Sequence, residues 1–418
     1  IHQNLIKQKM KLTKEDRYIR RRLRQGRKQA REFYYCRKYP INPKKIVFTT
    51  IEGTTGFSCN PKYIALELLR RRQDLDLVWL VDDMRKEFPT GIRKVKNTLK
   101  NRAYELSTAA VWVDNSRKQL ECRKRPGQFY LQTWHASIAL KPVGFQRGAS
   151  FSRIAKIVTE HDSRMTDLLV TNSLWVEEHV PLGLLYHGKM LRTGSARVDL
   201  LLNDRLSVRQ RFREKHGIAA DTKIVMYAPT FRSGTQSTMR KPELQNTMPD
   251  YEALMNALGK KFSGNWLVAL RLHPQLTARH ISLGKVQTVS NAVLDVSNED
   301  DMCELLGAAD ALLTDYSALA FDAAYMGLPV FLYVYDLTEY VKVRGNLVWD
   351  LQELPFPYAE SMNELCRLIM EFDVEAYGKA LEKIWGTTEL KEDGRASARI
   401  VDVIETRISA LANYHQGY

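Results

Sequence analysis

The stretch ALLTDYSALAFDAAYMGLPVFLYV (residues 311–334) indicates most directly which fold the chain adopts. It begins with the short apolar run ALLTD (311–315) and ends with a second run, PVFLYV (329–334). Between them the pattern predicts a helix from about Ser317 to Met326, closed by Gly327, because glycine readily takes the left-handed conformation that ends many helices. A strand, a helix and a strand in this order predict parallel strands of an α/β sheet.

The same alternation continues along the chain from residue 45 onward. Nearly continuous apolar strands separated by helices are typical of parallel sheets covered on both faces. Five such strands precede residue 203 and five follow it, so we expect two doubly wound, Rossmann-like domains facing a cleft. The expected strands are 45–51, 77–82, 109–114, 128–133 and 168–171 in the first domain, and 223–228, 266–272, 292–296, 311–315 and 329–334 in the second.

Four parts of the chain follow from this pattern. We predict a basic helical arm (1–44), a first domain (45–203), a second domain (204–375) and C-terminal helices (376–418) that fold back on the first domain. The polar segment 203–222 marks the boundary between the two domains. No uninterrupted run of apolar residues is long enough for a membrane-spanning helix.

Positive charge is concentrated in the arm. Residues 1–45 contribute +13 of the net charge of +15, with Leu5, Leu12, Ile19 and Leu23 forming a narrow apolar seam at helical spacing. Two interpretations remain open: the helix packs its seam on the protein body, or it lies as a basic amphipathic helix on an anionic membrane surface. A nucleic acid partner is not expected, because the body shows no basic stripe with interleaved aromatic residues.

Polar clusters follow four of the predicted strands, at QTWH (132–135), YAPTFR (227–232), RLHP (271–274) and TDYS (314–317). Ligands of open parallel sheets bind outside the carboxyl ends of the strands, so these clusters predict one shared site. Arg232 and His273 offer donors to phosphate oxygens. The Ser317 hydroxyl and the first N–H groups of the helix after it predict an anion site.

Other classes of site have little support in the sequence. The chain contains neither GxGxxG nor GxxxxGK[ST], which disfavours a nicotinamide-dependent dehydrogenase and a P-loop motor. The five cysteines are scattered without a CxxC pair, which favours reduced thiols in a cytosolic setting and argues against a zinc site. We therefore expect no tightly bound metal or cofactor.

Taken in order, these motifs resemble those of the CDP-glycerol glycerophosphotransferases, the teichoic acid primases and polymerases. The resemblance extends from about residue 46 to residue 345 and includes QTWHAS (132–137), TGSARVDLLL (193–202), MYAPTFR (226–232), RLHP (271–274) and TDYSALAFDAAYMGLPVFLYVYD (314–336). It implies the two-domain GT-B fold. It also implies transfer of glycerol phosphate from CDP-glycerol to a hydroxyl of a membrane lipid-linked saccharide or teichoic acid acceptor, with release of CMP.

The resemblance assigns roles to residues. His135 matches the catalytic base, while Trp134, Ser137 and Lys141 are expected beside it on the acceptor side of the cleft. The family usually has glycine where this chain has Ala136, which would narrow the acceptor site or shift His135. The positions expected to hold the nucleotide and phosphates of the donor are Arg232, His273, Thr314, Asp315, Tyr316, Ser317 and Arg344.

The partners implied are CDP-glycerol or another CDP-polyol, and a prenyl-diphosphate-linked saccharide at the cytoplasmic face of the membrane, where the protein would be peripheral. Mg²⁺ would act at most as a stimulant bound to the donor. The motifs fit priming and polymerising enzymes equally. Three alternatives stay open: a ribitol-phosphate transferase that uses CDP-ribitol, a GT-B glycosyltransferase that uses a nucleotide sugar, and a non-catalytic basic protein bound to membrane or nucleic acid.

Overall fold

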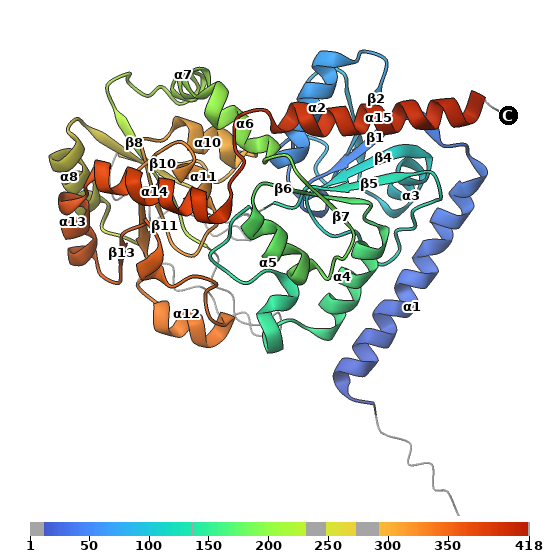
Figure 1. The fold of residues 1–418 in the computed structure, drawn as a ribbon, viewed down its shortest axis with the longest axis horizontal. Helices are drawn as coiled ribbons and strands as arrows, with labels where there is room; N and C mark the ends of the chain where they lie inside the picture. The colour runs from blue at the N-terminus through green and yellow to red at the C-terminus, as the bar shows by residue number, and fades with distance from the viewer. Residues whose placement is uncertain (1–11, 136, 231–247, 273–291, 417–418) are drawn as a thin grey trace, which may run out of the picture.

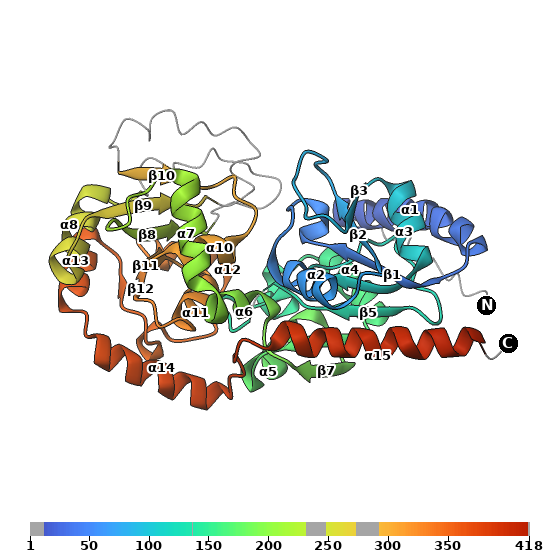
Figure 2. The ribbon, with the colours of Figure 1, turned by 90° about the horizontal axis from the view of Figure 1, so that it is seen from above.

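Two parallel sheets, each in its own domain, lie side by side in the protein (Figures 1 and 2). The computed structural model describes residues 12–135, 137–230, 248–272 and 292–416, with side chains up to residue 411. The first sheet has seven strands in the order β3-β2-β1-β4-β5-β6-β7, and the second has six in the order β10-β9-β8-β11-β12-β13. In both sheets the chain starts near the middle, runs out to one edge and then to the other. This is the doubly wound Rossmann order, so the predicted fold class is confirmed.

The strands and helices have the following bounds. The strands of the first sheet are β1 (Asn42–Thr49), β2 (Asp76–Val81), β3 (Ile92–Lys96), β4 (Ala109–Asp114), β5 (Phe129–Gln132), β6 (Leu168–Thr171) and β7 (Lys189–Arg192). Those of the second are β8 (Lys223–Ala228), β9 (Trp266–Leu270), β10 (Val293–Asp295), β11 (Ala311–Thr314), β12 (Val330–Tyr333) and β13 (Tyr358–Ala359). The α-helices up to the second domain are α1 (Lys14–Tyr35), α2 (Cys59–Arg71), α3 (Leu99–Thr108), α4 (Arg153–Met165), α5 (Leu174–Leu184) and α6 (Ala196–Asn203). Those that follow are α7 (Arg205–His216), α8 (Tyr251–Phe262), α10 (Met302–Ala308), α11 (Leu319–Ala324), α12 (Leu337–Arg344), α13 (Met362–Glu371), α14 (Val374–Thr388) and α15 (Ala396–Gln416).

All ten predicted strands are present, and three further strands were missed. The missed strands, β3, β7 and β13, each lie at the edge of a sheet. An edge strand faces solvent along one side and does not need a continuous apolar run. The sequences IRKVK of β3 and KMLR of β7 are accordingly half charged, and they carry little strand signal.

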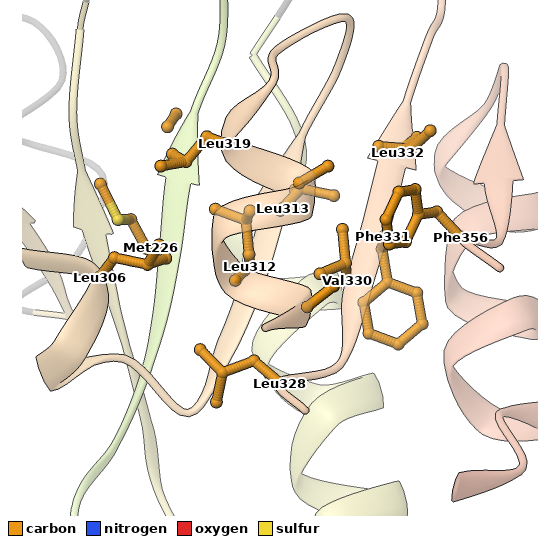
Figure 3. Close-up of a cluster of buried hydrophobic side chains, with 14 of the residues drawn as sticks. Met226, Leu306, Leu312, Leu313, Leu319, Leu328, Val330, Phe331, Leu332 and Phe356 are labelled. Atoms are coloured by element: carbon orange, nitrogen blue, oxygen red, sulfur yellow. The ribbon is translucent and has the colours of Figure 1, made fainter. Parts of the chain in front are cut away.

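The core of the second domain is apolar and continues into the first domain. Figure 3 shows side chains from β8, β11, β12, α10 and α11 packed against one another, among them Met226, Leu306, Leu312 and Phe331. The segment from Ile138 to Leu140, in the first domain, is buried in the same cluster. There the Trp349 Nε1–H of the second domain donates to the Ala139 carbonyl at 3.0 Å. Burying each such side chain contributes roughly 1.5–3 kcal/mol, so the two domains are firmly joined on this side.

The basic helix α1 packs its apolar seam on the first domain. Its buried residues are Ile19, Gly26, Ala30 and Phe33, which together with the half-buried Leu23 recur at helical spacing. A Cβ on Gly26 would come within 2.9 Å of the Leu120 Cβ, so the helix lies too close to the body for a larger residue there. The basic side chains lie on the opposite, exposed face, and α1 sits at the end of the first domain remote from the second (Figures 1 and 2).

The C-terminal helices divide between the two domains. Tyr377, Leu381 and Ile384 of α14 join the apolar core of the second domain. The chain then returns to the first domain with α15, whose Ile400 and Ile404 are buried in the core under β1 and β4. Among the described residues no helix is long and apolar enough to cross a membrane.

Candidate active site at the domain boundary

The predicted base, His135, follows a strained residue at the end of β5. Trp134 has a positive φ of 52°, a conformation that costs a bulky residue on the order of 1–3 kcal/mol. Three hydrogen bonds hold it there: its N–H donates to Gln132 Oε1 at 2.9 Å, and its carbonyl accepts from Asn60 Nδ2 at 3.1 Å and from Thr133 Oγ1 at 3.0 Å. His135 is exposed, whereas Thr133 and Ser137 are buried and Trp134 is half-buried.

The hydrogen bond of the His135 ring fixes its tautomer. Nδ1 lies 2.7 Å from the Asn115 carbonyl, which can only accept, so Nδ1 carries the proton and the lone pair of the neutral ring is on Nε2. The Trp134 ring packs against it, with centroids 4.2 Å apart. The ring is open to water on one side but otherwise closely surrounded by protein, and this burial lowers the pKa of His135 to about 4. The positive charges of Arg197, Arg117 and Lys141 act in the same direction as burial, and the hydrogen bond to the Asn115 carbonyl acts against it.

The carbonyl that holds His135 is itself held by the end of β1. Asn115, which is fully buried, accepts from the Ile51 N–H through its side-chain oxygen at 2.8 Å. Ser116 Oγ accepts from the Glu52 N–H at 2.9 Å. Ile51, Glu52 and Gly53 all have positive φ, at 43°, 58° and 94°. Since β1 and β4 are neighbours at the switch point of the sheet, this strained turn and His135 lie at the same edge of the sheet.

Arg197, on α6, links the His135 loop to the second domain. Its guanidinium donates through Nη1 to the His135 carbonyl and through Nη2 to Asp322 on α11, at 3.0 Å from Oδ1. Burial raises the pKa of the Asp322 carboxyl, and the charge of Arg197 opposes that shift. Neither residue was predicted from the sequence to have a role. Asp322 could have been noticed in the sequence, because it is an acid within the apolar stretch 318–334 and a buried carboxylate needs a partner.

The predicted donor turn joins β8 and β11 at their carboxyl ends. Thr314 Oγ1 donates to the Ala228 carbonyl at 2.7 Å, and the buried Asp315 carboxylate accepts from the Thr230 N–H at 2.9 Å. Tyr316 is buried, with its ring stacked on that of Tyr340. These three side chains therefore hold the turn in place, and the half-buried Ser317 lies beyond them.

The helix after this turn is shorter than predicted. α11 has six residues, from Leu319 to Ala324, where the sequence predicted a helix from about Ser317 to Met326. The Leu319 N–H donates to Ser317 Oγ at 3.3 Å, and Gly327 has a φ of 70°. A helix of this length offers a smaller dipole to an anion than the predicted one.

The other predicted residues lie on both sides of the domain boundary. Ser137 is buried, and its hydroxyl lies 3.0 Å from that of Tyr325, next to α11. Lys141 is half-buried and close enough to lower the pKa of His135. Arg344 ends α12, which packs on residues 144–150. The pKa of Arg147 in that segment is lowered mainly by burial and also by the positive charge of Arg344. Arg232, His273 and Ala136 lie outside the described residues.

Neither of two open hollows on the described surface contains these residues. One, of about 530 Å³, lies between α12 and residues 346–351. The other, of about 410 Å³, lies between α2, α6 and the start of α15. Among the described residues no group of three or more His, Cys, Asp or Glu side chains is placed to hold a metal ion. The site is therefore defined by the residues that the two domains bring together around His135.

Two doubly wound domains that meet at a histidine, with cationic side chains nearby, have the architecture of the GT-B class. A solved structure of the wall teichoic acid polymerase TagF has this fold: its TM-score with the chain is 0.76, at 24% identity, with 94% of this chain and 98% of that chain covered. The sequence profile of the CDP-Glycerol:Poly(glycerophosphate) glycerophosphotransferase family matches residues 32–406. The chain belongs to that family.

Curated relatives agree with this membership. The chain is 26% identical over 379 residues to a teichoic acid poly(glycerol phosphate) polymerase of Staphylococcus epidermidis, covering 88% of this chain and 51% of the relative. It is 28% identical over 381 residues to a teichoic acid glycerol-phosphate transferase of Staphylococcus aureus, covering 87% and 93%. The chain thus spans about half the length of the first relative and nearly all of the second.

Proposed function

We propose that this protein transfers glycerol phosphate from CDP-glycerol to a hydroxyl of a lipid-linked saccharide or teichoic acid acceptor, with His135 as the general base. The acceptor oxygen attacks the phosphorus bonded to glycerol, and an O–P bond forms while the pyrophosphate bond breaks. CMP leaves with the bonding electrons, and the hydroxyl proton passes to His135 Nε2. Cationic groups near the site, among them Lys141 and Arg344, would stabilise the charge that develops on the phosphate oxygens.

The observation that carries this proposal is the state of His135. Its Nδ1 proton is fixed on the Asn115 carbonyl, and its pKa lies well below neutrality, so Nε2 is unprotonated and able to accept a proton at physiological pH. Family membership supplies the reaction class. The same geometry would suit CDP-ribitol, and several relatives are named for ribitol phosphate, including a teichoic acid ribitol-phosphate primase. Transfer of ribitol phosphate is therefore the second candidate.

Nucleotide release tests the proposal. The protein is incubated with CDP-glycerol, CDP-ribitol and UDP-sugars together with a lipid-linked saccharide acceptor, and release of CMP or UDP is followed. We expect acceptor-dependent release of CMP, and a loss of roughly 10²–10⁴-fold in His135→Ala, the usual contribution of a general base. Release of UDP alone, or full activity in His135→Ala, would contradict it.

We also propose that the reaction needs no tightly bound metal, because cationic side chains can neutralise the diphosphate. Treatment with a chelator, followed by removal of the chelated ions, is expected to leave at least part of the turnover. Mg²⁺ added back can raise the rate by binding the donor. Complete loss of turnover that Mg²⁺ alone restores would show that the metal is essential.

The acceptor and the basic face of α1 suggest where the protein works. A prenyl-diphosphate-linked saccharide is held at the cytoplasmic face of the membrane, and we propose that the protein is peripheral to that surface. The exposed Arg and Lys side chains of α1 support this, since anionic lipids attract basic residues near the surface.

A further inference from the structure

Arg197 contacts the backbone of the proposed base and a carboxylate of the other domain at once. We propose that Arg197 is a positioning residue for His135, and that Asp322 of the second domain holds Arg197 in place. The inference rests on the proposed function, because it takes His135 as the base. Neither residue is expected to touch substrate, so both would act through the His135 loop.

Two carbonyls of the His135 loop are held by a pair of linked side chains. Arg197 Nη1 donates to the His135 carbonyl, and Asn60 Nδ2 donates to the Trp134 carbonyl at 3.1 Å. Asn60 and Arg197 are themselves joined, because the backbone N–H of Arg197 donates to Asn60 Oδ1 at 3.0 Å. Trp134 keeps its φ of 52° only where its surroundings hold it there. Loss of the Arg197 contact would let the His135 peptide relax.

The ion pair between Arg197 and Asp322 contributes little net stability by itself. Arg197 and Asp322 are 5% and 4% exposed, and desolvation of such a buried pair roughly cancels the Coulombic attraction. Apolar side chains of similar volume would pack as well. What they could not do is hold the His135 carbonyl, whereas a planar guanidinium can bind a carboxylate along one edge and a carbonyl along another. The contact to His135 therefore explains why an arginine is buried here.

The same pair connects the base to the donor side of the site. Asp322 belongs to α11, which begins directly after the turn of Thr314 to Ser317. Asp322 and Arg197 form one link between that element and the His135 loop, and the Ser137 hydroxyl, which contacts Asp322 and Tyr325, forms another. The support that Arg197 gives to the His135 carbonyl is thus tied to the second domain through Asp322, whereas the Asn115 and Asn60 contacts lie within the first domain.

Replacing both charges separates positioning from stability. In Arg197→Met/Asp322→Leu the pair becomes apolar, so we expect a melting temperature close to that of the wild type. Turnover should nevertheless fall roughly 10²-fold, with the KM for CDP-glycerol nearly unchanged, because misplacement of the base by about 1 Å costs this much. Arg197→Lys is the second variant. It keeps the charge and a partner for Asp322 but cannot span both contacts, and it should lose turnover as well.

Lys62→Met is the matched control. Lys62 of α2 is also a buried cation of the first domain, paired with Asp301 of the second at 2.8 Å, but it has no contact with the His135 loop. Lys62→Met should lower the stability of the protein and leave kcat within about threefold of the wild type. Wild-type turnover in the double variant, or an equal loss of kcat in Lys62→Met, would overturn the inference.

An NMR titration of the His135 ring tests the inference without turnover. Arg197 lowers the pKa of His135, so the double variant should titrate at higher pH than the wild type, whereas Lys62→Met should not. Unchanged titration in the double variant would overturn the positioning role. Absence of CMP release from wild-type protein with any CDP-polyol would instead refute the proposed function, and the titration would still report on Arg197.

Discussion

His135 is a weak base in the absence of ligand. Burial lowers its pKa to about 4, and Arg197, Arg117 and Lys141 act in the same direction. Such an imidazole is unprotonated at neutral pH but accepts a proton from an alcohol less readily than one with a pKa near 7. The phosphate groups of a bound donor would bring negative charge close to the ring, and negative charge stabilises the imidazolium. Donor binding should therefore raise the pKa of the base towards the range in which it works best.

We expect different pH profiles for kcat/KM and for kcat. The base is active when unprotonated, so the rate falls as the pH drops below its pKa. The acid limb of kcat/KM reports the free protein and should lie near pH 4, whereas the limb of kcat reports the complex and should lie at higher pH. Steady-state rates from about pH 3 to pH 9 measure both limbs. Coincident limbs would show that the donor does not change the pKa of the base.

At the scale of elements, α1 uses its two faces differently. The apolar seam is occupied by the first domain, with Phe33 fully buried, so the seam is not available for insertion into a membrane. Removal of the helix would expose that core and is expected to destabilise the first domain. Attraction to a membrane would have to come from the basic face, which remains exposed. The structure thus supports packing of the helix on the body, while membrane binding stays a prediction.

The basic face can be tested without removing the helix. Arg17, Arg21, Arg24 and Lys28 are exposed and lie opposite the seam, so their replacement by Gln should leave the fold unchanged. Binding to anionic vesicles should weaken by about 1 kcal/mol for each charge removed. In the wild type it should also weaken steeply as salt is raised.

A vesicle-binding control removes the same number of charges elsewhere. Lys260, Arg367, Lys379 and Lys383 are exposed on helices of the second domain, and their replacement by Gln should leave vesicle binding almost unchanged. Equal losses in the two variants would mean that net charge alone matters and that α1 has no special role.

At the scale of the molecule, the segment between α14 and α15 carries a half-buried acid at the domain boundary. Glu392 accepts from Asn172 Nδ2 at 2.8 Å and from the Ser195 N–H at 3.1 Å, and Asn172 also donates to Tyr325 of the second domain. Burial raises the pKa of Glu392 to about 8. The folded protein therefore keeps a proton on Glu392 at neutral pH that the unfolded chain releases.

Stability should depend on pH through this proton. Between the pKa of an unfolded glutamate and about pH 8 the folded state binds more protons, so the contribution of Glu392 to stability is full at low pH and is lost as the pH rises to 8. The slope for one group is at most about 1.4 kcal/mol per pH unit. Glu392→Gln removes the titration, so its melting temperature relative to the wild type should rise from pH 5 to pH 8. A constant difference between the two proteins would contradict the raised pKa.

The sequence by itself determined the class of fold and predicted the edge of the sheets at which a site would lie. Apolar runs such as ALLT and VFLY, separated by helical segments, are local features that indicate buried parallel strands. Polar residues at the ends of these strands, including His135 and the turn after Thr314, indicate the edge where ligands bind. Part of the seam of α1 was also visible, because helical spacing is a local property: Ile19 and Leu23 pack on the body, whereas Leu12 is exposed before the helix and Leu5 lies outside the described residues.

Only the tertiary structure decided which residues hold His135. Arg197 is 62 positions from His135 and 125 from Asp322, and Asn115 is 20 positions from His135. The chain has 63 Lys and Arg residues and 48 Asp and Glu residues, so no local pattern shows which cation pairs with which carboxylate. The edge strands were missed for a related reason, since exposure on one side removes the apolar signal. Periodicity along the chain indicates which face of each helix or strand is buried. Contacts between distant elements depend instead on how the whole molecule packs.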